Sequence, residues 1–461
     1  MALQHRGHDA AGVAGLGVVE PRCIEIVKDL GKVANVITPK NIRKFTGNTF
    51  VGHTRYATRN KDTSKREIHP HWAQSLNGRL AIVTNGDMLN VTEQKEFLDR
   101  FKIRTYTTND AEILAAVVNY HIRFKNRDVM TAVKKAMLNI KGGYAGLILL
   151  EEDDRLVGFR DPWGIRPLHI AEFEIQGQKG VAFASETCAF DILQRYCSIR
   201  YQDDQLTFDG QPSGEQMVFK YREVLPGEII AVNPDCSIES VQYHSTPSKS
   251  IGCVFESIYF SRPDSLQRGE SFQVLRERIG KQLFEESPVE ADIVTAVPKG
   301  GIPSAVGFAR ASGIPYSVVI LEEPITGGIR SFTTNEKDRK SIAAMKYNIL
   351  ADVVQGKKLV VVDDSIVRGT TMRLLVKALF QAGAAEVHLR IPCPPYSHAC
   401  HYGIATKDPQ SLISNNKTNG EICEELGATS LSYISLSGLY TALEKPRNYF
   451  CDECLSGDSP I

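Results

Sequence analysis

The sequence predicts two domains that each combine helices and strands: an α+β domain with layered sheets over residues 1–245, and an α/β domain with a parallel sheet over residues 253–461. Three observations lead to this prediction. Short strand-like segments broken by Gly, Asn and Asp turns fill the first part. Buried-type strands alternate with helical segments in the second part. A stretch rich in Ser, Pro and Gly, residues 244–252, lies between them.

In the first domain, apolar runs bounded by turn residues predict strands at 78–87, 144–161 and 180–186. Two other segments, 110–124 and 128–140, have helical spacing. In the first of these, Ile113, Val117 and Tyr120 recur every three or four residues. We therefore expect helices and sheets stacked in layers around one core.

In the second domain, continuous β-branched runs predict buried strands at 291–297, 358–364 and 386–391. A helical segment, 372–383, follows the second run, and Met372, Leu375 and Leu379 share one of its faces. Buried strands that alternate with helices are typical of a parallel α/β sheet.

Composition favours a cytoplasmic protein that acts on small molecules. Lysine plus arginine and aspartate plus glutamate each number 54, so no net positive charge exists to attract nucleic acid or an anionic membrane. The segment from Met1 to Glu20 lacks the apolar core of a secretory signal, and no apolar run approaches the length of a membrane span. In a reducing compartment the 10 cysteines are expected as thiols or metal ligands.

A phosphate-binding loop is predicted in LVVVDDSIVRGTT, residues 359–371. A buried strand ends in Asp363 and Asp364, and a loop with Gly369 then opens a helix. Backbone N–H groups at a helix N-terminus bind phosphate, and acidic residues at a strand end hold ribose hydroxyls or Mg²⁺. The alternative is a pair of aspartates that only caps the next helix.

This stretch closely resembles the 5-phosphoribosyl-1-pyrophosphate (PRPP) motif of type I phosphoribosyltransferases, and DDSIVRGTT is similar to the version in the amidophosphoribosyltransferase family. The resemblance implies that Asp363 and Asp364 bind the ribose hydroxyls of PRPP, directly or with Mg²⁺. It also implies a set of residues that bind the 5′-phosphate: Ser365, Arg368, Gly369, Thr370 and Thr371.

A second glycine turn, AVPKGGIPSA (296–305), resembles the pyrophosphate loop of that family, which implies pyrophosphate binding by Lys299, Gly300 and Gly301. The family usually has Pro-Asp-Ser-Gly there, so Lys299 exchanges a carboxylate for a cation, which can strengthen pyrophosphate binding. A surface lysine on a turn is the alternative.

Residues 327–341 lie where the family has a loop that closes over PRPP and helps to form an ammonia channel, and Arg330 matches its arginine. The Pro and Gln that usually follow are absent. A changed acceptor or altered coupling is therefore an alternative.

The first domain carries candidate groups for holding glutamine: Arg55 for its α-carboxylate, Asp110 for its ammonium, and Asn85 with Gly86 as oxyanion donors. Each has a simpler explanation as a turn-forming Asn-Gly or a helix-capping Asp. Their order, together with LQHRGHDAAG, FRDPWGIRPL and ASETCAFD, resembles the N-terminal-nucleophile (Ntn) glutamine amidotransferase domain of the same family.

That resemblance implies an α/β-β/α sandwich, a glutamine amidotransferase type 2 domain, ahead of a type I phosphoribosyltransferase domain. Two positions depart from the family's usual His-Asn-Gly-Asn, because this chain has Thr84 and Asp87, which can alter local hydrogen bonding. Residues 197–224 look longer than the family's equivalent and are expected to be a surface insertion.

The family's nucleophile, an N-terminal cysteine upstream of Leu-Gln-His-Arg-Gly, has no counterpart in this sequence. Cys23 is internal and has no free amine, so glutaminase activity is not expected from this chain as written. The domain is either incomplete at its N-terminus, with Met1 an internal methionine, or has lost the nucleophile.

The cysteines form a further pattern. The C-x-x-C in YFCDECLSGD suits zinc, an iron–sulfur cluster or a redox pair. Four cysteines match the ligand positions of family members with a 4Fe-4S cluster, and they are Cys253, Cys400, Cys451 and Cys454. Buried structural thiols and zinc are the alternatives, and Cys393 is the nearest rival to Cys400.

The resemblance implies glutamine- or ammonia-dependent amination of PRPP to 5-phosphoribosylamine with release of pyrophosphate, the first step of purine synthesis. It also implies Mg²⁺ and 4Fe-4S cofactors, purine nucleotide inhibitors and a homo-oligomer, dimer or tetramer. One alternative is a phosphoribosyltransferase paralogue with another amine acceptor and no glutaminase activity. The other is a non-catalytic protein that binds PRPP or nucleotides.

Overall fold

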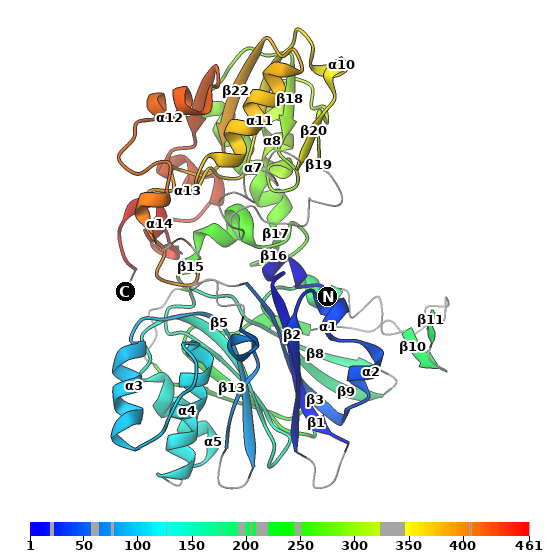
Figure 1. The fold of residues 1–461 in the computed structure, drawn as a ribbon, viewed down its shortest axis with the longest axis vertical. Helices are drawn as coiled ribbons and strands as arrows, with labels where there is room; N and C mark the ends of the chain where they lie inside the picture. Colours follow the sequence, from blue (N-terminus) through cyan, green and yellow to red (C-terminus); the bar gives the residue numbers. More distant parts are fainter. Residues whose placement is uncertain are drawn as a thin grey trace. The chain divides into compact units, whose positions relative to one another are not determined.

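A computed structural model describes residues 1–18, 23–56, 64–74, 78–125, 127–175, 177–191, 199–202, 205–208, 220–244, 250–322, 346–404, 406 and 408–460. The chain divides into two compact units (Figure 1): unit 1, Met1–Gly252 with His401–Ala405, and unit 2, Cys253–Cys400 with Thr406–Ile461. Arg330 with its loop 327–341, and residues 209–219 of the expected insertion, lie outside the described residues.

A six-stranded antiparallel sheet forms the centre of unit 1, in the order β14-β13-β7-β6-β5-β4. Its strands are β4 (His71–Gln74), β5 (Arg79–Met88), β6 (Gly142–Leu150), β7 (Leu156–Arg160), β13 (Glu228–Val232) and β14 (Ile238–Gln242). Helices α4 (Asp110–Arg123) and α5 (Val129–Met137) pack on one face of this sheet, and α3 (Val91–Arg100) packs beside α4.

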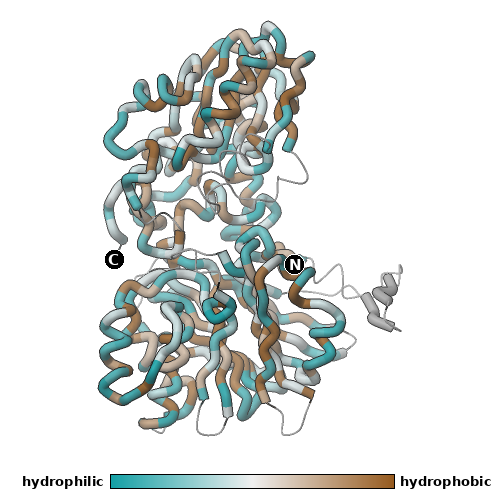
Figure 2. Tube along the Cα trace, viewed as in Figure 1, coloured by the Kyte–Doolittle hydropathy of each residue, from teal (hydrophilic) through white to brown (hydrophobic). Residues whose placement is uncertain are grey.

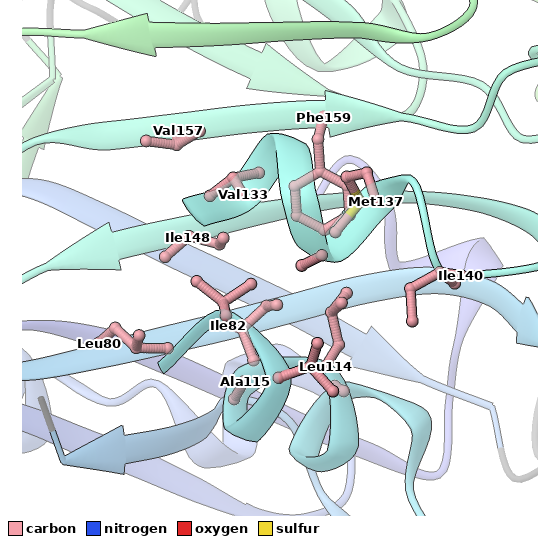
Figure 3. Packing of buried hydrophobic residues seen from close by; sticks show 14 of the residues in the cluster. Leu80, Ile82, Leu114, Ala115, Val133, Met137, Ile140, Ile148, Val157 and Phe159 are labelled. Carbon is pink, nitrogen blue, oxygen red and sulfur yellow. The ribbon is translucent and has the colours of Figure 1, made fainter. Parts of the chain in front are cut away.

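The core between this sheet and its helices is apolar and closely packed (Figure 3). Leu80 and Ile82 of β5 point toward Leu114 of α4, while Phe159 of β7 lies beside Met137 of α5. All five side chains are buried, so the helical spacing of the sequence matches the face that each helix turns to the sheet. This packing fixes the start of α4 next to the end of β5.

The opposite face of the central sheet packs against two three-stranded sheets, β2-β1-β3 and β12-β8-β9. Their strands are β1 (Ala10–Gly17), β2 (Ile24–Leu30), β3 (Phe45–Arg55), β8 (His169–Ile175), β9 (Gln178–Ala184) and β12 (Lys220–Glu223). Ala14 of β1 and Ile170 of β8 share a buried cluster with Val83 of β5. Short helices α1 (Val33–Val36) and α2 (Pro39–Ile42) follow β2. Unit 1 is thus a layered sandwich.

Unit 2 is built on a four-stranded parallel sheet in the order β18-β21-β22-β23. The strands are β18 (Ile293–Ala296), β21 (Lys358–Val362), β22 (Glu386–Ile391) and β23 (Ser430–Tyr433). The longer helices are α7 (Phe272–Glu286), α8 (Ile302–Ser312), α11 (Thr370–Gln381), α12 (Asn419–Leu426) and α13 (Leu436–Leu443). Because β18 and β21 are parallel neighbours, the loops that follow them meet at the same edge of the sheet.

Several short elements complete the described chain. Two-stranded pairs are formed by β10 (Ile199–Gln202) with β11 (Gln205–Phe208), β15 (Gly252–Cys253) with β24 (Phe450–Cys451), β16 (Leu266–Gln267) with β17 (Glu270–Ser271), and β19 (Ile320–Glu322) with β20 (Tyr347–Ile349). Short helices are α10 (Ala351–Val354) and α14 (Glu453–Ser456).

Hydrophobic stretches of the chain occur in both units (Figure 2). No helix among the described residues is both long and apolar enough to cross a membrane.

Candidate functional site

The candidate phosphate loop of unit 2 joins the buried strand β21 to helix α11. Gly369 is the N-cap residue of α11, and its φ of 72° is one that favours glycine. A Cβ at this position would also collide with the side chain of Ile413. As a glycine, this N-cap residue has no side chain that could cap the helix, and N–H groups at a helix N-terminus bind phosphate.

Asp363 and Asp364 stand at the carboxyl end of β21, where the sequence places them. Asp363 Oδ1 accepts a hydrogen bond from the Asp364 N–H at 2.9 Å, and Ser365 Oγ donates to Asp364 Oδ2 at 2.8 Å. Burial, followed by the negative charge of Asp364, raises the pKa of Asp363 well above its usual range. Burial likewise raises the pKa of Asp364. These two adjacent, half-buried carboxylates make a binding place for a cation or for hydroxyl donors.

The glycine turn after β18 lies against this pair of carboxylates. A Cβ at Gly300 would collide with Asp364 Oδ1, and a Cβ at Gly301 would collide with the carbonyl oxygen of Val362. The structure therefore brings together the two loops that the sequence singles out. Lys299 Nζ lies 3.5 Å from Glu322 Oε2, and its side chain is 86% exposed. This cation is thus partly balanced by a carboxylate of β19.

Tyr347 is a residue near this site that sequence reasoning missed. It begins β20 and pairs with Glu322 in register. Burial raises the pKa of Tyr347, and the charges of Asp363 and Glu322 raise it further. No motif in the sequence marks Tyr347, because it is distant in sequence from both loops of the site. Its strand β20 follows residues 323–345, which the structure does not describe.

The cysteines that match a cluster-binding pattern are buried. They are Cys253, Cys400, Cys451 and Cys454. Burial, then the charges of Cys400, Cys253, Cys393 and Cys451, raise the pKa of Cys454, so these thiols lie within electrostatic reach of one another. Within the described part of the chain, however, no group of three or more His, Cys, Asp or Glu side chains is arranged to hold a metal ion.

The candidate oxyanion donors of unit 1 lie on β5, where Asn85 pairs with Ala145 and Gly86 with Tyr144 of β6. Gly86 has a φ of 129°, and a Cβ there would collide with the carbonyl oxygen of Gly143. Glycine is therefore required at this point by both conformation and space.

Arg166 orients the side chain of Asn85. Arg166 Nη2 donates to Asn85 Oδ1 at 3.1 Å, which leaves Asn85 Nδ2 buried with no hydrogen-bond partner. A buried donor without a partner has lost its hydration, so it is ready to bind a ligand oxygen.

The turn that carries Arg166 is held by its neighbours. Asp161 accepts hydrogen bonds from the backbone N–H groups of Trp163, Ile165 and Arg166. The sequence contained this turn in FRDPWGIRPL but gave no signal that Arg166 orients Asn85.

Arg55 and Asp110 reach the same region from two other elements. Arg55 is the last residue of β3 and is buried. Asp110 is the first residue of α4, and its Oδ2 accepts a hydrogen bond of 2.6 Å from the Met88 N–H, two residues beyond Gly86. Asn109 is the N-cap of α4, with its side chain accepting from the Ala111 N–H at 2.9 Å. Asp110 is therefore not needed as the cap of α4.

A short loop that follows Cys400 also belongs to unit 1, and sequence reasoning missed it. Tyr402 and Ile404 are buried, and a Cβ at Gly403 would lie 3.0 Å from Gly86 Cα and 3.6 Å from Arg166 Cζ. Gly403 has a φ of 110°. The loop therefore lies directly against the candidate oxyanion strand.

Known families match both units. A glutamine amidotransferase domain matches residues 53–191, and a phosphoribosyl transferase domain matches residues 264–422. The amidophosphoribosyltransferase of Synechococcus elongatus is 36% identical over 461 residues, which covers 100% of this chain and 87% of the relative. The chain belongs to the amidophosphoribosyltransferase family. The amidophosphoribosyltransferase of Bacillus subtilis is 35% identical over 459 residues, which covers 99% of this chain and 88% of that protein.

Two solved structures are similar over the whole chain. The glutamine PRPP amidotransferase from B. subtilis complexed with ADP and GMP has a TM-score of 0.83 at 34% identity, covering 100% of this chain and 92% of that chain. A structure described as the allosteric regulatory enzyme of purine biosynthesis has a TM-score of 0.84 at 34% identity, covering 100% and 91%. These matches confirm the predicted fold class and the prediction of an amidophosphoribosyltransferase-like enzyme, a pentosyltransferase.

Proposed function

We propose that this protein displaces pyrophosphate from C1 of PRPP with ammonia, giving 5-phosphoribosylamine, and that a glutamine site in unit 1 serves this reaction. The observation that carries the proposal is the edge of the unit 2 sheet, where a half-buried pair of aspartates, a glycine turn and the N-terminus of α11 meet. These groups match the hydroxyls, pyrophosphate and 5′-phosphate of PRPP in chemical type.

In unit 2, Asp363 and Asp364 would hold the ribose hydroxyls together with Mg²⁺. Mg²⁺ prefers carboxylate oxygens and would neutralise charge on the departing pyrophosphate. The 5′-phosphate would bind at the N-terminus of α11, to backbone N–H groups and side chains of Ser365, Arg368, Gly369, Thr370 and Thr371. The pyrophosphate would bind to Lys299, Gly300 and Gly301, and Arg330 would cover PRPP from the loop 327–341.

In unit 1, Asn85 and Gly86 would donate hydrogen bonds to the amide oxygen of glutamine. The buried, unpartnered Nδ2 of Asn85 supports this role. Arg55 would bind the α-carboxylate and Asp110 the ammonium group. We propose that residues 1–245 form this amidotransferase domain and that residues 253–461 form the phosphoribosyltransferase domain with a cluster-binding tail.

The glutaminase step needs a nucleophile, and neither Cys188 nor Cys23 suits this role. Cys188 is fully buried, and its Sγ donates to Glu186 at 3.9 Å. Cys23 lies just before β2 and has no free amine. We propose that the nitrogen donor is ammonia, either taken up directly or released from glutamine.

We propose that Cys253, Cys400, Cys451 and Cys454 bind a 4Fe-4S cluster. The donor set fits such a cluster, because the four thiols are buried and near enough to shift each other's pKa. The cluster would have a structural role. Iron and acid-labile sulfide content with visible absorbance test this on anaerobically purified protein. Zinc in place of iron would contradict the cluster proposal. A Cys454→Ser variant that keeps its full metal content would contradict it as well.

By analogy with the ADP- and GMP-bound relative, purine nucleotides are expected to inhibit the enzyme. We also propose a cytoplasmic homo-oligomer, dimer or tetramer. Light scattering of the purified protein, with and without GMP, measures the oligomeric state.

The decisive assay follows pyrophosphate release from PRPP and Mg²⁺ with ammonium, with glutamine, or with other amines. Release that requires ammonium supports the proposal. Release only with a different amine supports a paralogue with another acceptor, for which the exposed Lys299 is the specific observation. PRPP binding without turnover under any condition would make the protein a non-catalytic binder.

A further inference from the structure

Three histidine rings lie together at the edge of the candidate oxyanion strand. The His53 and His69 rings stack, with centroids 4.1 Å apart, and the His69 and His71 rings meet edge to face at 5.3 Å. His53 comes from β3, His71 from β4, and His69 from the turn just before β4. His69 and His71 are buried and His53 is half-buried. No role in the proposed function uses these side chains.

Two of these rings form hydrogen bonds with the backbone of Thr84, one with its N–H and one with its carbonyl oxygen. The Thr84 N–H donates to His69 Nδ1 at 3.3 Å, and His53 Nε2 lies 3.0 Å from the Thr84 carbonyl oxygen. The first contact requires a lone pair on His69 Nδ1. The second requires a proton on His53 Nε2, because a carbonyl oxygen only accepts. His69 must therefore be neutral with its proton on Nε2. His53 must carry a proton on Nε2, and its pKa, lowered to about 4, makes this the neutral Nε2–H tautomer at neutral pH.

Thr84 is the residue directly before Asn85 and Gly86 on β5. A strand residue held at both its N–H and its C=O cannot shift or rotate without breaking a bond, so the position of the next two residues is fixed with it. The imidazole rings reach this backbone from β3 and from the turn before β4.

We propose that His53 and His69 are positioning residues that fix the Thr84 backbone and thereby aim the oxyanion donors Asn85 and Gly86 at a glutamine amide oxygen. The inference rests on the proposed glutamine site, and it extends that site to two residues that do not touch the substrate. The turn that carries His69 is itself anchored, because Lys28 Nζ donates to the carbonyl oxygens of Ile68 and Pro70 at 2.5 and 3.0 Å.

Burial, helped by nearby cations, keeps the three rings neutral. Burial is the largest cause that lowers the pKa of His53 to about 4 and that of His71 to about 3, and it lowers that of His69 well below its usual range. The cations Lys28 of β2 and Arg55 of β3 act in the same direction. A hydrogen bond to the backbone of Glu67 acts in the opposite direction and raises the pKa of His71. The carboxylates of Glu112 and Glu67 raise the pKa of Lys28.

The test measures how strongly the site polarises its ligand. The δ-carbonyl carbon of 5-¹³C-glutamine moves downfield when its oxygen accepts strong hydrogen bonds, and this signal needs no nucleophile. We expect a downfield shift on binding to the full chain. His69→Phe and His53→Met should remove most of that shift and change the Kd for glutamine little, because Arg55 and Asp110 still hold the amino acid.

Conservative variants separate positioning from packing. His69→Asn keeps an acceptor at the Nδ1 position and His53→Gln keeps a donor at the Nε2 position, so both should restore the shift. His71→Phe is the matched control, because it removes a ring of the same cluster without removing either of the two bonds to Thr84, and it should leave the shift intact. Long-range ¹H–¹⁵N spectra of the ligand-free protein should show His53 and His69 as neutral Nε2–H tautomers between pH 6 and pH 8.

Each contrary result has a distinct meaning. If glutamine binds and the carbonyl shift is the same in His69→Phe as in the unchanged protein, the positioning role is wrong while the glutamine site stands. Protonated rings, or Nδ1–H tautomers, would also overturn the positioning role. If glutamine does not bind to the unchanged protein at all, the proposed glutamine site fails and the inference fails with it.

Discussion

The two candidate sites differ in how the chain supplies them. In unit 2, one stretch from Asp363 to Thr371 provides both the carboxylates and the helix N-terminus, and a single glycine turn completes the site. In unit 1, the candidate glutamine site draws on β3, β5, the start of α4 and the turn that carries Arg166, with the loop 401–404 packed against it.

This difference has a physical consequence. A contiguous site is fixed by local geometry, since the strand and helix that flank it set its shape. An assembled site depends on many packed contacts, so its accuracy is sensitive to residues that never touch the ligand. Substitutions at the two sites test that contrast.

Asp364→Asn should lower kcat/KM for PRPP in ammonium-dependent pyrophosphate release by about 100-fold or more, because losing one group that stabilises the transition state costs about this much. Asp352→Asn removes the same charge from the exposed helix α10 and should leave the rate unchanged. Equal rates for Asp364→Asn and the unchanged protein would exclude this carboxylate from the reaction.

Arg55→Ala should weaken glutamine binding by about 10- to 100-fold in calorimetric titration, since a hydrogen bond to a charged group contributes about 1.5–3 kcal/mol. Arg100→Ala, an exposed arginine in the last turn of α3, is the matched control. Similar Kd values for both variants would place the α-carboxylate elsewhere.

Gly403→Ala should lower the free energy of unfolding of unit 1 by about 1–3 kcal/mol, because it forces a left-handed backbone on alanine and brings its Cβ to 3.0 Å from Gly86 Cα. The 2 tryptophans of the chain, Trp72 and Trp163, both lie in unit 1, so their fluorescence during urea unfolding reports this unit.

Gly52→Ala is the control for this substitution, because its Cβ would meet nothing nearer than 3.7 Å and its backbone needs no positive φ. Its unfolding free energy should stay the same or rise slightly. A Gly403→Ala protein as stable as Gly52→Ala would show that the loop 401–404 does not pack against β5.

His71→Phe should make the stability of unit 1 less sensitive to acid. The pKa of His71 is lowered to about 3 in the folded state, against about 6.5 when unfolded, so the unfolded state binds more protons between these values. Stability from this group is therefore present above pH 6.5 and is lost as the pH falls, by about 1.4 kcal/mol per pH unit.

Urea unfolding at pH 4.5, 5.5 and 6.5 measures the slope. As the pH falls, the free energy of unfolding should decrease less steeply in the variant than in the unchanged protein, by about 1.4 kcal/mol per pH unit. An identical slope in both proteins would mean that His71 titrates normally in the folded state.

Most of the fold was predictable from hydrophobic periodicity. The helices expected at 110–124 and 128–140 are α4 and α5, and the buried runs at 358–364 and 386–391 contain β21 and β22. Periodicity succeeds here because each element turns one face to a single core. The parallel order of the unit 2 strands followed from the helices between them.

The site in unit 1 was predictable only in part. Asn85 and Asp110 belong to short motifs, but the importance of Arg166, His69 and Gly403 depends on contacts between segments that are far apart in sequence. No local pattern encodes such contacts, because each of these residues is unremarkable among its own neighbours. The roles given to all of these residues stay predictions until the variants are measured.

The measurement that tests the central claim most directly traces nitrogen to C1 of the ribose. The protein is supplied with PRPP, Mg²⁺ and ¹⁵N-ammonium, and the product is analysed by mass spectrometry, with Asp364→Asn in parallel. The account predicts ¹⁵N-labelled 5-phosphoribosylamine and one pyrophosphate for each product from the unchanged protein, and almost none from the variant. Pyrophosphate release with no labelled amine, or equal labelling by the variant, would contradict it.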